Sequence, residues 1–367
     1  MQKSMKTENL PCVKAEKKRG EQVRKALKEL ELLRTDAKIT ADGDFIYLPL
    51  IRALKEKEIG ARGADELVTR EFEVRDQRKE IEDVVGFKPS FEIIGDIAVL
   101  TDVIKEANEL LVAHAIMKLH KNIKVVAKRI SPVEGVFRKR KMKILAGENR
   151  TETIHKENGC KYKLDLEKVY FNPRLATERN RVALQVHRSG KEEVMDIFAG
   201  VGSFSIQIAK RASQSRVTAI DINPDAIRYL RENIKLNGVR NIEAIESDIR
   251  EIYVNFKNKA DRIIMNLPKS AYLFLKEALS MLNPEGGIIH FYDVESSYVS
   301  NDKSKSLDVA INKAKDKLMA TVKEACEHEG FYFHSIEILA ARKVKPYAPY
   351  AHIIGIDATI KKIRKVL

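Results

Sequence analysis

The chain has 367 residues, of which 44% are hydrophobic and 33% are charged, and its net charge is +14. This length suffices for two or three domains with a sizeable core, and the basic excess indicates a polyanionic partner. No C-x-x-C spacing, membrane-length apolar run or signal-peptide core is present, which argues against a disulfide scaffold, a zinc ribbon and a membrane protein, so we expect a cytoplasmic protein without a metal.

The first 75 residues are expected to form a small N-terminal domain. One amphipathic helix is predicted over residues 16–33, and a short strand is predicted over residues 44–51. No internal repeat or low-complexity linker interrupts the chain here or further on.

Residues 76–167 are expected to form a second, α+β domain. A strand pair over 91–102 is broken by Gly95, and a helix follows over 103–122 with apolar residues that include Leu110 and Leu111. Four further strands are predicted, over residues 124–130, 140–147, 152–159 and 161–171.

Much of the positive charge lies in this second domain. Residues 117–150 hold eleven Lys or Arg and two Glu, including the block RKRKMK at 138–143. A run of this kind is often a solvated face. Because it lies on strands next to a catalytic domain, we favour a nucleic-acid surface.

Residues 168–367 alternate between strands and helices. This alternation is typical of βαβ units with a parallel sheet. The final segment, 331–360, offers two strands without a helix between them, which predicts an antiparallel hairpin. The fold class is therefore α/β, a Rossmann-like class I methyltransferase outline. The five parallel strands are predicted over residues 192–200, 216–223, 242–248, 260–268 and 286–294.

The first of these strands ends in the sequence DIFAGVGSFS, a loop with two glycines. It lacks the lysine and hydroxyl of a P-loop, and Ser205 replaces the third glycine of a dinucleotide loop. Gly200 and Gly202 allow the backbone to pass close to a ligand. Asp196 is suited to a cationic ammonium, so we assign Asp196, Phe198 and both glycines to a pocket for S-adenosylmethionine.

The next strand ends supply further acidic residues. Asp221 lies about twenty residues after the glycine loop, where an acidic side chain accepts from ribose hydroxyls. Ile222 is expected beside the adenine ring. Asp248 and the backbone of Ile249 are expected at the adenine amino group. Acids that merely end strands are the alternative interpretation.

The fourth strand ends in Asn266, Leu267, Pro268 and Lys269. Many methyltransferases carry N-P-P-[YF] at this place, and its aromatic ring stacks on a planar amine substrate. Lys269 cannot stack in that way, so a simple exocyclic adenine amine is disfavoured as the target.

Several motifs together resemble the archaeal and eukaryotic type of tRNA (guanine-37-N1)-methyltransferase. The resemblance extends over nearly the whole chain, although Ser203 stands where the family usually has proline. It implies tRNA as partner, recognised at the anticodon loop and at the outer corner by the N-terminal domain, and it suggests no protein partner, hence a monomer. The motifs are DIFAGVGSFSI, AIDINPDAIRYLRENIKLN, MNLPKSA, TIHKENG, VYFNPRLATER, KALKELELL, DGDFIYLPL and FEIIGDIAVL.

The resemblance also implies roles for particular residues. Tyr170 falls on the family pattern, Glu178 resembles its general base, and Arg179 resembles a cofactor contact. Arg138 resembles the arginine that contacts the target guanine, although Arg140 and Arg150 lie close by in the sequence. Asn266 and Pro268 resemble the pair in the family's NLP motif.

The chemistry of N1 methylation fits these roles. N1 of guanine carries a proton at neutral pH, so a base such as Glu178 has to remove it. The departing proton leaves negative charge on O6, which a fixed guanidinium such as that of Arg138 stabilises. Without the family pattern, Glu178 would be read as an i,i+3 ion-pair partner of Arg181 or Arg174 on a helix.

Three alternatives remain open at this point. The related aminocarboxypropyl transferase of wybutosine synthesis also acts at position 37, and some archaeal relatives also methylate C7 of a wyosine precursor. The third alternative is a non-catalytic RNA-binding protein that retains the cofactor fold.

Overall fold

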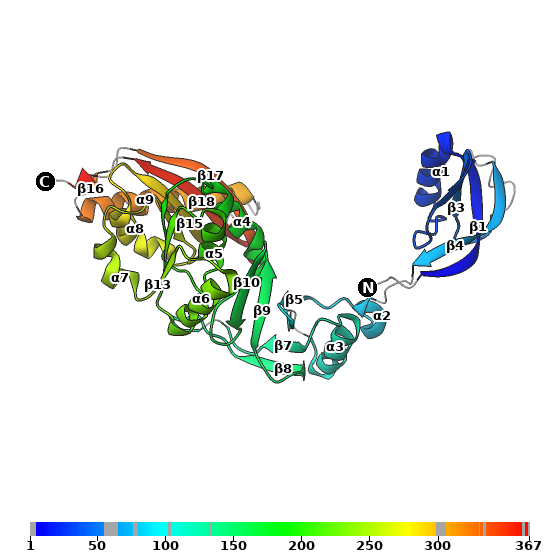
Figure 1. The fold of residues 1–367 in the computed structure, drawn as a ribbon, viewed down its shortest axis with the longest axis horizontal. Coiled ribbons are helices and arrows are strands. Elements are labelled where there is room, and N and C mark those ends of the chain that lie inside the picture. The colour runs from blue at the N-terminus through cyan, green and yellow to red at the C-terminus, as the bar shows by residue number, and fades with distance from the viewer. Residues whose placement is uncertain are drawn as a thin grey trace. The chain divides into compact units, whose positions relative to one another are not determined.

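The structure is a computed structural model, and it divides into two compact units, residues 1–84 and 85–367, each described here by itself (Figure 1). The predicted boundaries at residues 75 and 167 stay predictions. The structure describes residues 5–54, 65–75, 80–101, 104–132, 134–298, 306–329, 331–332, 335–361 and 364–365.

The first unit is a four-stranded sheet with order β2-β3-β1-β4, covered by helix α1. The predicted helix and the strand at 44–51 are both present, whereas β1 and β4 were not predicted. Val23 and Leu27 of α1 are buried against the sheet. The elements are β1 (Met5–Glu16), α1 (Lys17–Glu29), β2 (Thr40–Asp42), β3 (Phe45–Pro49) and β4 (Glu66–Arg75).

The second unit begins with a sheet of order β5-β6-β7-β8. The predicted strand pair is confirmed, and Gly95 between its strands has φ +61°. The predicted helix is present as α3, although two of its apolar residues, Leu110 and Leu111, are exposed. Glu109 faces inward instead and pairs with Lys128 at 2.6 Å. The elements are α2 (Ile81–Val85), β5 (Phe91–Ile94), β6 (Ile97–Leu100), α3 (Glu106–Leu119), β7 (Val125–Arg129) and β8 (Met142–Gly147).

A β-hairpin leads into the next layer. Strands β9 (Glu152–Glu157) and β10 (Cys160–Asp165) pair antiparallel across Asn158 and Gly159, which both have positive φ. Buried residues of β10, among them Tyr162, pack against helix α6 (Pro224–Asn237).

The methyltransferase-like part is a seven-stranded sheet of order β13-β12-β11-β14-β15-β18-β17. The five predicted parallel strands and the antiparallel terminal hairpin are all confirmed. The strands are β11 (Glu193–Asp196), β12 (Arg216–Asp221), β13 (Ile242–Glu246), β14 (Arg262–Met265), β15 (Gly287–Ser296), β17 (Ser335–Ala348) and β18 (Ala351–Lys361).

Helices cover both faces of this sheet. Helices α4 and α5 pack on one face, and α8 and α9 pack on the other (Figure 1). Helix α9 was not predicted from the sequence. The remaining elements are η3 (Pro173–Leu175), α4 (Ala176–Gln185), α5 (Ser203–Arg211), α7 (Ile249–Ile252), η4 (Tyr253–Phe256), η5 (Ala271–Phe274), α8 (Leu275–Met281), α9 (Leu307–Glu329), β16 (Phe331–Tyr332) and β19 (Arg364–Lys365).

Within the described ranges, every helix is too short or too polar to cross a membrane. The same residues contain no group of three or more His, Cys, Asp or Glu side chains that could hold a metal ion.

Candidate active site

A pocket of about 530 Å³ opens at the carboxyl ends of β11, β12 and β14, where open α/β sheets bind their ligands. The loop between β7 and β8 and the segment after β10 also line it. Three of the predicted site residues do not line this pocket, namely Asp196, Gly202 and Glu178. Those that do are Arg138, Tyr170, Arg179, Phe198, Gly200, Asp221, Ile222, Asp248, Ile249, Asn266 and Pro268.

The two glycines of the loop after β11 serve different purposes. Gly200 has φ +55°, lines the pocket, and donates from its backbone N–H to Asp221 Oδ2 at 2.7 Å. Gly202 has φ +84°, and a Cβ there would lie 2.2 Å from Leu230 Cδ1. Gly202 is therefore required for the packing of α5 on α6 rather than for a ligand contact.

Asp196 lies beneath this loop and is fully buried. Ser205 Oγ donates to its Oδ2 at 2.7 Å, whereas its buried Oδ1 has no hydrogen-bond partner among the described residues. Burial, together with the nearby carboxylate of Asp221, raises the pKa of Asp196 to about 7, although the hydrogen bond from Ser205 acts to lower it. Ser205, which replaces the third glycine of a dinucleotide loop, thus binds the carboxyl group of the first strand.

Asp221 ends β12 and faces the pocket. Its Oδ1 accepts from the backbone N–H of Asn223 at 2.9 Å. Burial raises the pKa of Asp221, although its two backbone hydrogen bonds act to lower it. A carboxylate keeps further acceptor sites when each oxygen has accepted once, so ribose hydroxyls can still be bound.

Asp248 lies two residues after β13 and caps helix α7 by accepting from the backbone N–H of Arg250 at 2.9 Å. The side chain of Arg250 also pairs with Asp248 and lowers the pKa of this carboxyl group. Asp248 is therefore an ionised carboxylate at this strand end, as predicted, but the charge of Arg250 partly neutralises it.

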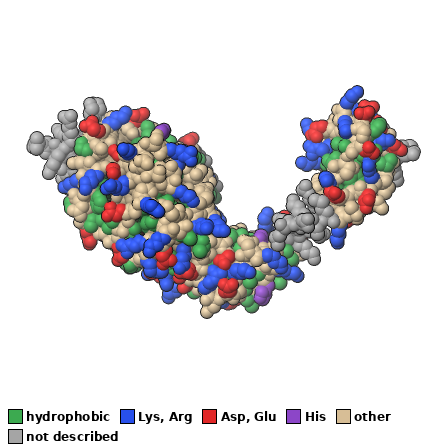
Figure 2. All heavy atoms as spheres, viewed as in Figure 1, with side chains coloured by type: hydrophobic (Ala, Val, Ile, Leu, Met, Phe, Trp, Pro, Cys, Tyr) green, Lys and Arg blue, Asp and Glu red, His purple; other side chains and the backbone are tan. Residues whose placement is uncertain are grey.

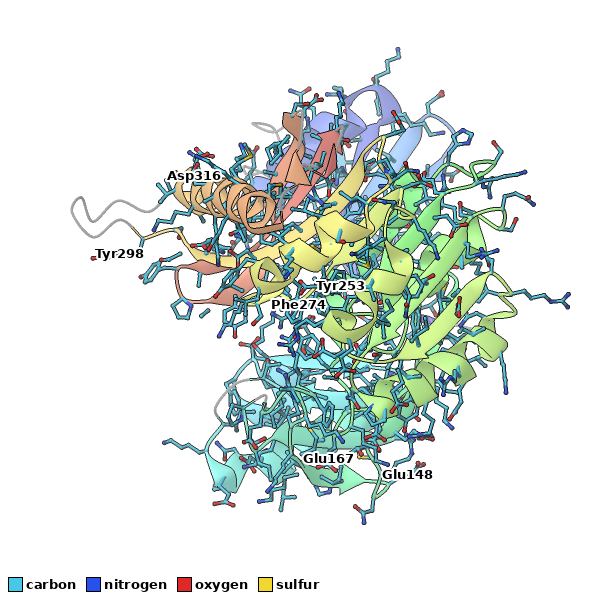
Figure 3. The ribbon with its side chains drawn as sticks, turned by 90° about the vertical axis from the view of Figure 1, so that its left-hand side faces the viewer. Glu148, Glu167, Tyr253, Phe274, Tyr298 and Asp316 are labelled. Atoms are coloured by element: carbon cyan, nitrogen blue, oxygen red, sulfur yellow. The ribbon has the colours of Figure 1, made fainter. Side chains whose placement is uncertain are left out.

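An apolar wall completes this end of the pocket. The rings of Phe198 and Phe274 meet edge to face with centroids 5.0 Å apart, and Ile222 is 39% exposed beside the same pocket. In Figure 3, Phe274 lies between the layer of α8 and the β5–β8 region. Sequence reasoning missed Phe274, because nothing in its helical pattern separates a pocket residue from a core residue. The wall fits a flat, apolar ring such as adenine.

Arg138 reaches the pocket from the β7–β8 loop, where its φ is +54°. Its guanidinium carbon lies 4.5 Å from the ring centroid of Tyr170. The guanidinium of Arg140 lies farther from that ring, at 5.8 Å, and burial lowers its pKa. Arg150 pairs with Asp96 at 2.6 Å and does not line the pocket.

The NLPK segment after β14 forms another side of the pocket. The Oδ1 atom of Asn266 is buried and has no hydrogen-bond partner among the described residues. An orphaned acceptor of this kind is costly unless a ligand satisfies it. Lys269 has φ +84°, and its ammonium lies 4.8 Å from the ring centroid of Tyr347, a pocket residue that the sequence did not indicate.

Arg179 lines the pocket but is almost fully buried. Its Nε donates to Glu157 at 2.6 Å, and its Nη2 donates to the carbonyl of Asn172 at 3.2 Å. This pairing anchors the segment before α4, in which Tyr170 shortly precedes Asn172.

Glu178 is part of a closed network on the first turn of α4. Its carboxylate accepts from Arg181 at 2.8 Å, from Arg342 at 2.6 Å and from the Tyr292 hydroxyl at 2.7 Å. Asp357 accepts from the same guanidinium groups, at 2.7 Å from Arg181 and 3.1 Å from Arg342. We call Glu178, Arg181, Arg342 and Asp357 the Glu178 ring. The i,i+3 ion pair with Arg181 is thus present, whereas Arg342 and Asp357 could not be identified from the sequence.

The basic segment at 117–150 is partly neutralised within the fold. Figure 2 shows Lys and Arg side chains mixed with acidic ones over the visible face of the second unit. Ion pairs to Glu or Asp are formed by Lys128, Arg129, Lys139, Lys143 and Arg150. Exposed lysines without an ion pair among the described residues are Lys118, Lys121, Lys124 and Lys141.

Family models match most of the chain in three successive parts. Residues 12–58 match the tRNA methyltransferase 5 N-terminal domain, residues 77–151 match the TYW2 N-terminal domain, and residues 153–322 match the TRM5/TYW2 methyltransferase domain.

Curated relatives resemble the chain over nearly its full length. The tRNA (guanine(37)-N(1))-methyltransferase Trm5b of Pyrococcus abyssi is 41% identical over 94% of this chain and 98% of its own. Trm5b of Methanocaldococcus jannaschii is 38% identical over 96% and 99%. A tRNA(Phe) (4-demethylwyosine(37)-C(7)) aminocarboxypropyltransferase of M. jannaschii is 32% identical over 74% of this chain and 98% of its own.

Solved structures give the same result. The crystal structure of P. abyssi Trm5b has a TM-score of 0.69 and 39% identity, with 96% of this chain and 99% of that chain covered. A complex of aTrm5 with tRNALeu has a TM-score of 0.64 and 36% identity, covering 95% and 99%. M. jannaschii TYW2 in complex with AdoMet has a TM-score of 0.54 and 28% identity, covering 74% and 100%.

Proposed function

The chain belongs to the TRM5/TYW2 methyltransferase family, and we propose that it transfers a methyl group from S-adenosylmethionine to N1 of guanosine 37 in tRNA. The observation that carries this proposal is the pocket itself. It combines acidic strand ends and an apolar wall with a guanidinium and an orphaned amide oxygen. We also predict that the protein is cytoplasmic and monomeric.

The pocket residues fit the methyl donor, which supplies an electrophilic methyl group on a positively charged sulfonium. Asp221 would hold the ribose hydroxyls, and Phe198, Ile222 and Phe274 would enclose the adenine ring. Asp248 and the backbone of Ile249 would face the adenine amino group. Among the described residues, the guanidinium that lines this half of the pocket is that of Arg250, which is paired with Asp248, so no P-loop-like phosphate clamp is formed there, and this supports a nucleoside rather than a nucleotide.

The substrate guanine would be held by Arg138, Asn266 and Tyr170. Arg138 lines the pocket, whereas Arg150 is bound by Asp96, so we assign Arg138 to the charge that develops on O6. The buried Oδ1 of Asn266 can accept a hydrogen bond from the N2 amino group of guanine. Pro268 limits the backbone freedom of this segment.

Glu178 would take the N1 proton. Both of its carboxylate oxygens already accept hydrogen bonds in the Glu178 ring. Proton transfer therefore requires that one of these bonds be exchanged for a bond to the substrate. Arg342 belongs to β17, whose residue Tyr347 lines the pocket, so a substrate contact there could help to release Glu178.

The tRNA would contact both units. The match of residues 12–58 to the tRNA methyltransferase 5 N-terminal domain supports recognition of the outer corner by the first unit. The pocket and the unpaired lysines of the segment 117–150 support a contact with the anticodon loop by the second unit.

Two related activities are kept as a second candidate, because relatives with these names match the chain. One is aminocarboxypropyl transfer, and the other is methylation of 4-demethylwyosine. The relative with the first activity matches only about three quarters of the chain, whereas both Trm5b relatives match nearly all of it.

The proposal is tested by incubating the full chain with a tRNA transcript and S-adenosylmethionine, then mapping the modified nucleotide by mass spectrometry. We expect one added methyl group at N1 of guanosine 37. An added aminocarboxypropyl group, or methylation only of a wyosine precursor, would favour the second candidate. Binding of both ligands without any product would favour a non-catalytic protein.

The role of Glu178 is tested by Glu178→Gln. Single-turnover methyl transfer should fall about 10²–10⁴-fold, the range for a positioned general base. Affinities for tRNA and S-adenosylmethionine should change little, because the loss belongs to the transition state. The residual rate should rise with pH, since hydroxide can replace part of the missing basicity. An unchanged rate at neutral pH would show that the base lies elsewhere.

A further inference from the structure

The NLPK segment lacks the aromatic residue that many methyltransferases place after N-P-P, yet the pocket contains an aromatic ring at this end. Tyr347 lies on β17, far along the chain, and lines the same pocket as Asn266 and Lys269. The ammonium of Lys269 lies 4.8 Å from the centroid of its ring. The ring thus adjoins the residue that replaces the missing aromatic.

We propose that Tyr347 is a substrate-positioning residue, which stacks on the nucleobase that enters the pocket. This inference rests on the proposed function, because it takes a tRNA guanine as the substrate. Tyr347 lies on the β17–β18 hairpin and supplies the flat surface that the NLPK segment itself cannot provide.

The exposure and surroundings of Tyr347 suit a stacking role. The residue is 46% exposed, although it lines a pocket, and Leu273 beside the same pocket is 61% exposed. A half-exposed ring in a pocket that also holds an apolar side chain offers a face on which a planar base can stack. Lys269 covers one part of the ring as a cation–π partner, which holds the ring in place.

The polar groups around the ring would recognise the edges of the base. Asn266 presents an orphaned acceptor, and Arg138 presents a guanidinium, so donors and acceptors of a guanine can both be satisfied. Stacking on Tyr347 contributes no such discrimination, because every base has a π-face. Tyr347 should therefore affect how well the base is held, and the edge contacts should decide which base is accepted.

A fluorescence experiment tests the stacking directly. The full chain is mixed with a tRNA that carries 2-aminopurine at the target position, whose emission is quenched by stacking. Emission in the complex should be higher with Tyr347→Ala than with wild type, and Tyr347→Phe should restore the quench. Equal emission from wild type and Tyr347→Ala, both at saturating protein, would overturn the proposal.

A kinetic experiment with unmodified tRNA completes the test. Tyr347→Ala should lower kcat/KM for tRNA about 5- to 150-fold, which is the factor that ~1–3 kcal/mol of lost stacking represents. S-adenosylmethionine affinity should stay unchanged. The matched control is Tyr350→Ala, at the tip of the same hairpin with 49% exposure, which should keep the wild-type kcat/KM. Equal losses in both variants would overturn the proposal.

Failure of the proposed function gives a different result. If wild type itself transfers no methyl group to guanosine 37, the proposed function fails, whatever the variants do. If wild type is active and Tyr347→Ala is equally active, only the stacking proposal fails.

Discussion

The pocket and the Glu178 ring contain similar side chains but use them in opposite ways. In the pocket, Asn266 Oδ1 is buried without a partner among the described residues, and Asp221 accepts only backbone N–H groups. In the ring, both carboxylates accept from both guanidinium groups. The pocket thus keeps hydrogen-bonding capacity for a ligand, whereas the ring satisfies its own groups.

The pKa shifts of two buried carboxyl groups reflect this difference. Asp196, beneath the pocket, has its pKa raised to about 7 by burial, and within the described ranges it forms no ion pair. Burial also acts to raise the pKa of Asp357 in the ring, but the hydrogen bond from His290 and the charge of Arg181 lower it overall. A buried carboxylate stays ionised when cations surround it. A buried carboxylate near a site for a cationic ligand lacks such cations, so its ionised form is destabilised until the ligand binds.

The largest effect is expected from breaking the ring. Asp357→Ala leaves Arg181, Arg342 and the buried His290 without their shared acceptor. Removal of one partner from a buried ion pair typically costs about 3–5 kcal/mol, and we expect the lower end of this range because Glu178 still accepts from both guanidinium groups. Urea denaturation of the full chain, followed by circular dichroism, should show a loss of that size in the free energy of unfolding.

A matched control separates this effect from the loss of any carboxylate. Glu337 lies on β17 and pairs with Lys361, but both side chains are more than half exposed. Glu337→Ala should cost less than about 1 kcal/mol, as exposed pairs do. If Asp357→Ala cost no more than this control, the ring would not be a stabilising element.

A smaller effect is expected from opening the pocket at Asp221. Asp221→Ala removes the acceptor for the ribose hydroxyls and leaves the N–H groups of Gly200 and Asn223 unpaired. Affinity for S-adenosylmethionine should fall by roughly 1–3 kcal/mol, the cost of leaving a buried partner unsatisfied. Calorimetry measures the loss, and tRNA affinity should stay the same. Wild-type affinity in this variant would contradict the placement of the ribose.

The contrast between the two regions also explains how far the sequence was informative. The pocket is built from strand ends that follow one another in βαβ units, so spacing alone brings Gly200, Asp221 and Asn266 together. The parallel strands were predicted for the same reason, whereas the terminal hairpin was predicted because no helix separates its two strands. Residues of the Glu178 ring lie as far apart as Glu178 and Asp357, and the pairing of β18 with β15 on one side and with β17 on the other brings them together.

Other misses have local causes. Strands β1 and β4 pair across most of the first unit, and a pairing between distant segments leaves little local signal. Tyr347 and Phe274 were missed because an aromatic residue in a strand or helix is more often part of a core. Roles for Glu178, Arg138, Tyr170 and Arg179 came only from the family resemblance, and they stay predictions.

A third prediction concerns Asp196 and pH. Its folded pKa is about 7, above the ordinary 3.8, so the folded state binds a proton more tightly than the unfolded state. The stability contributed by this group is present below about pH 4 and is lost as pH rises toward 7, by at most ~1.4 kcal/mol per pH unit. Asp196→Asn should remove this slope, which thermal unfolding at pH 5 and pH 7 measures. Parallel pH profiles of variant and wild type would contradict it.

The smallest effect extends the comparison to the surface, where Lys141 is exposed and Lys139 pairs with Asp225 at 2.8 Å. If Lys141 contacts a phosphate of tRNA, Lys141→Gln should reduce the slope of log K against log salt by about 0.7–0.9, the value for one phosphate contact. Lys139→Gln should change this slope much less, because Asp225 already holds the ammonium. Filter binding between 50 and 200 mM salt (about the range over which such slopes are resolved) measures both slopes, and S-adenosylmethionine affinity should not change.

Equal slopes for Lys141→Gln and wild type would show that this lysine is only solvated. A larger change in Lys139→Gln than in Lys141→Gln would show that the RNA displaces the internal ion pair.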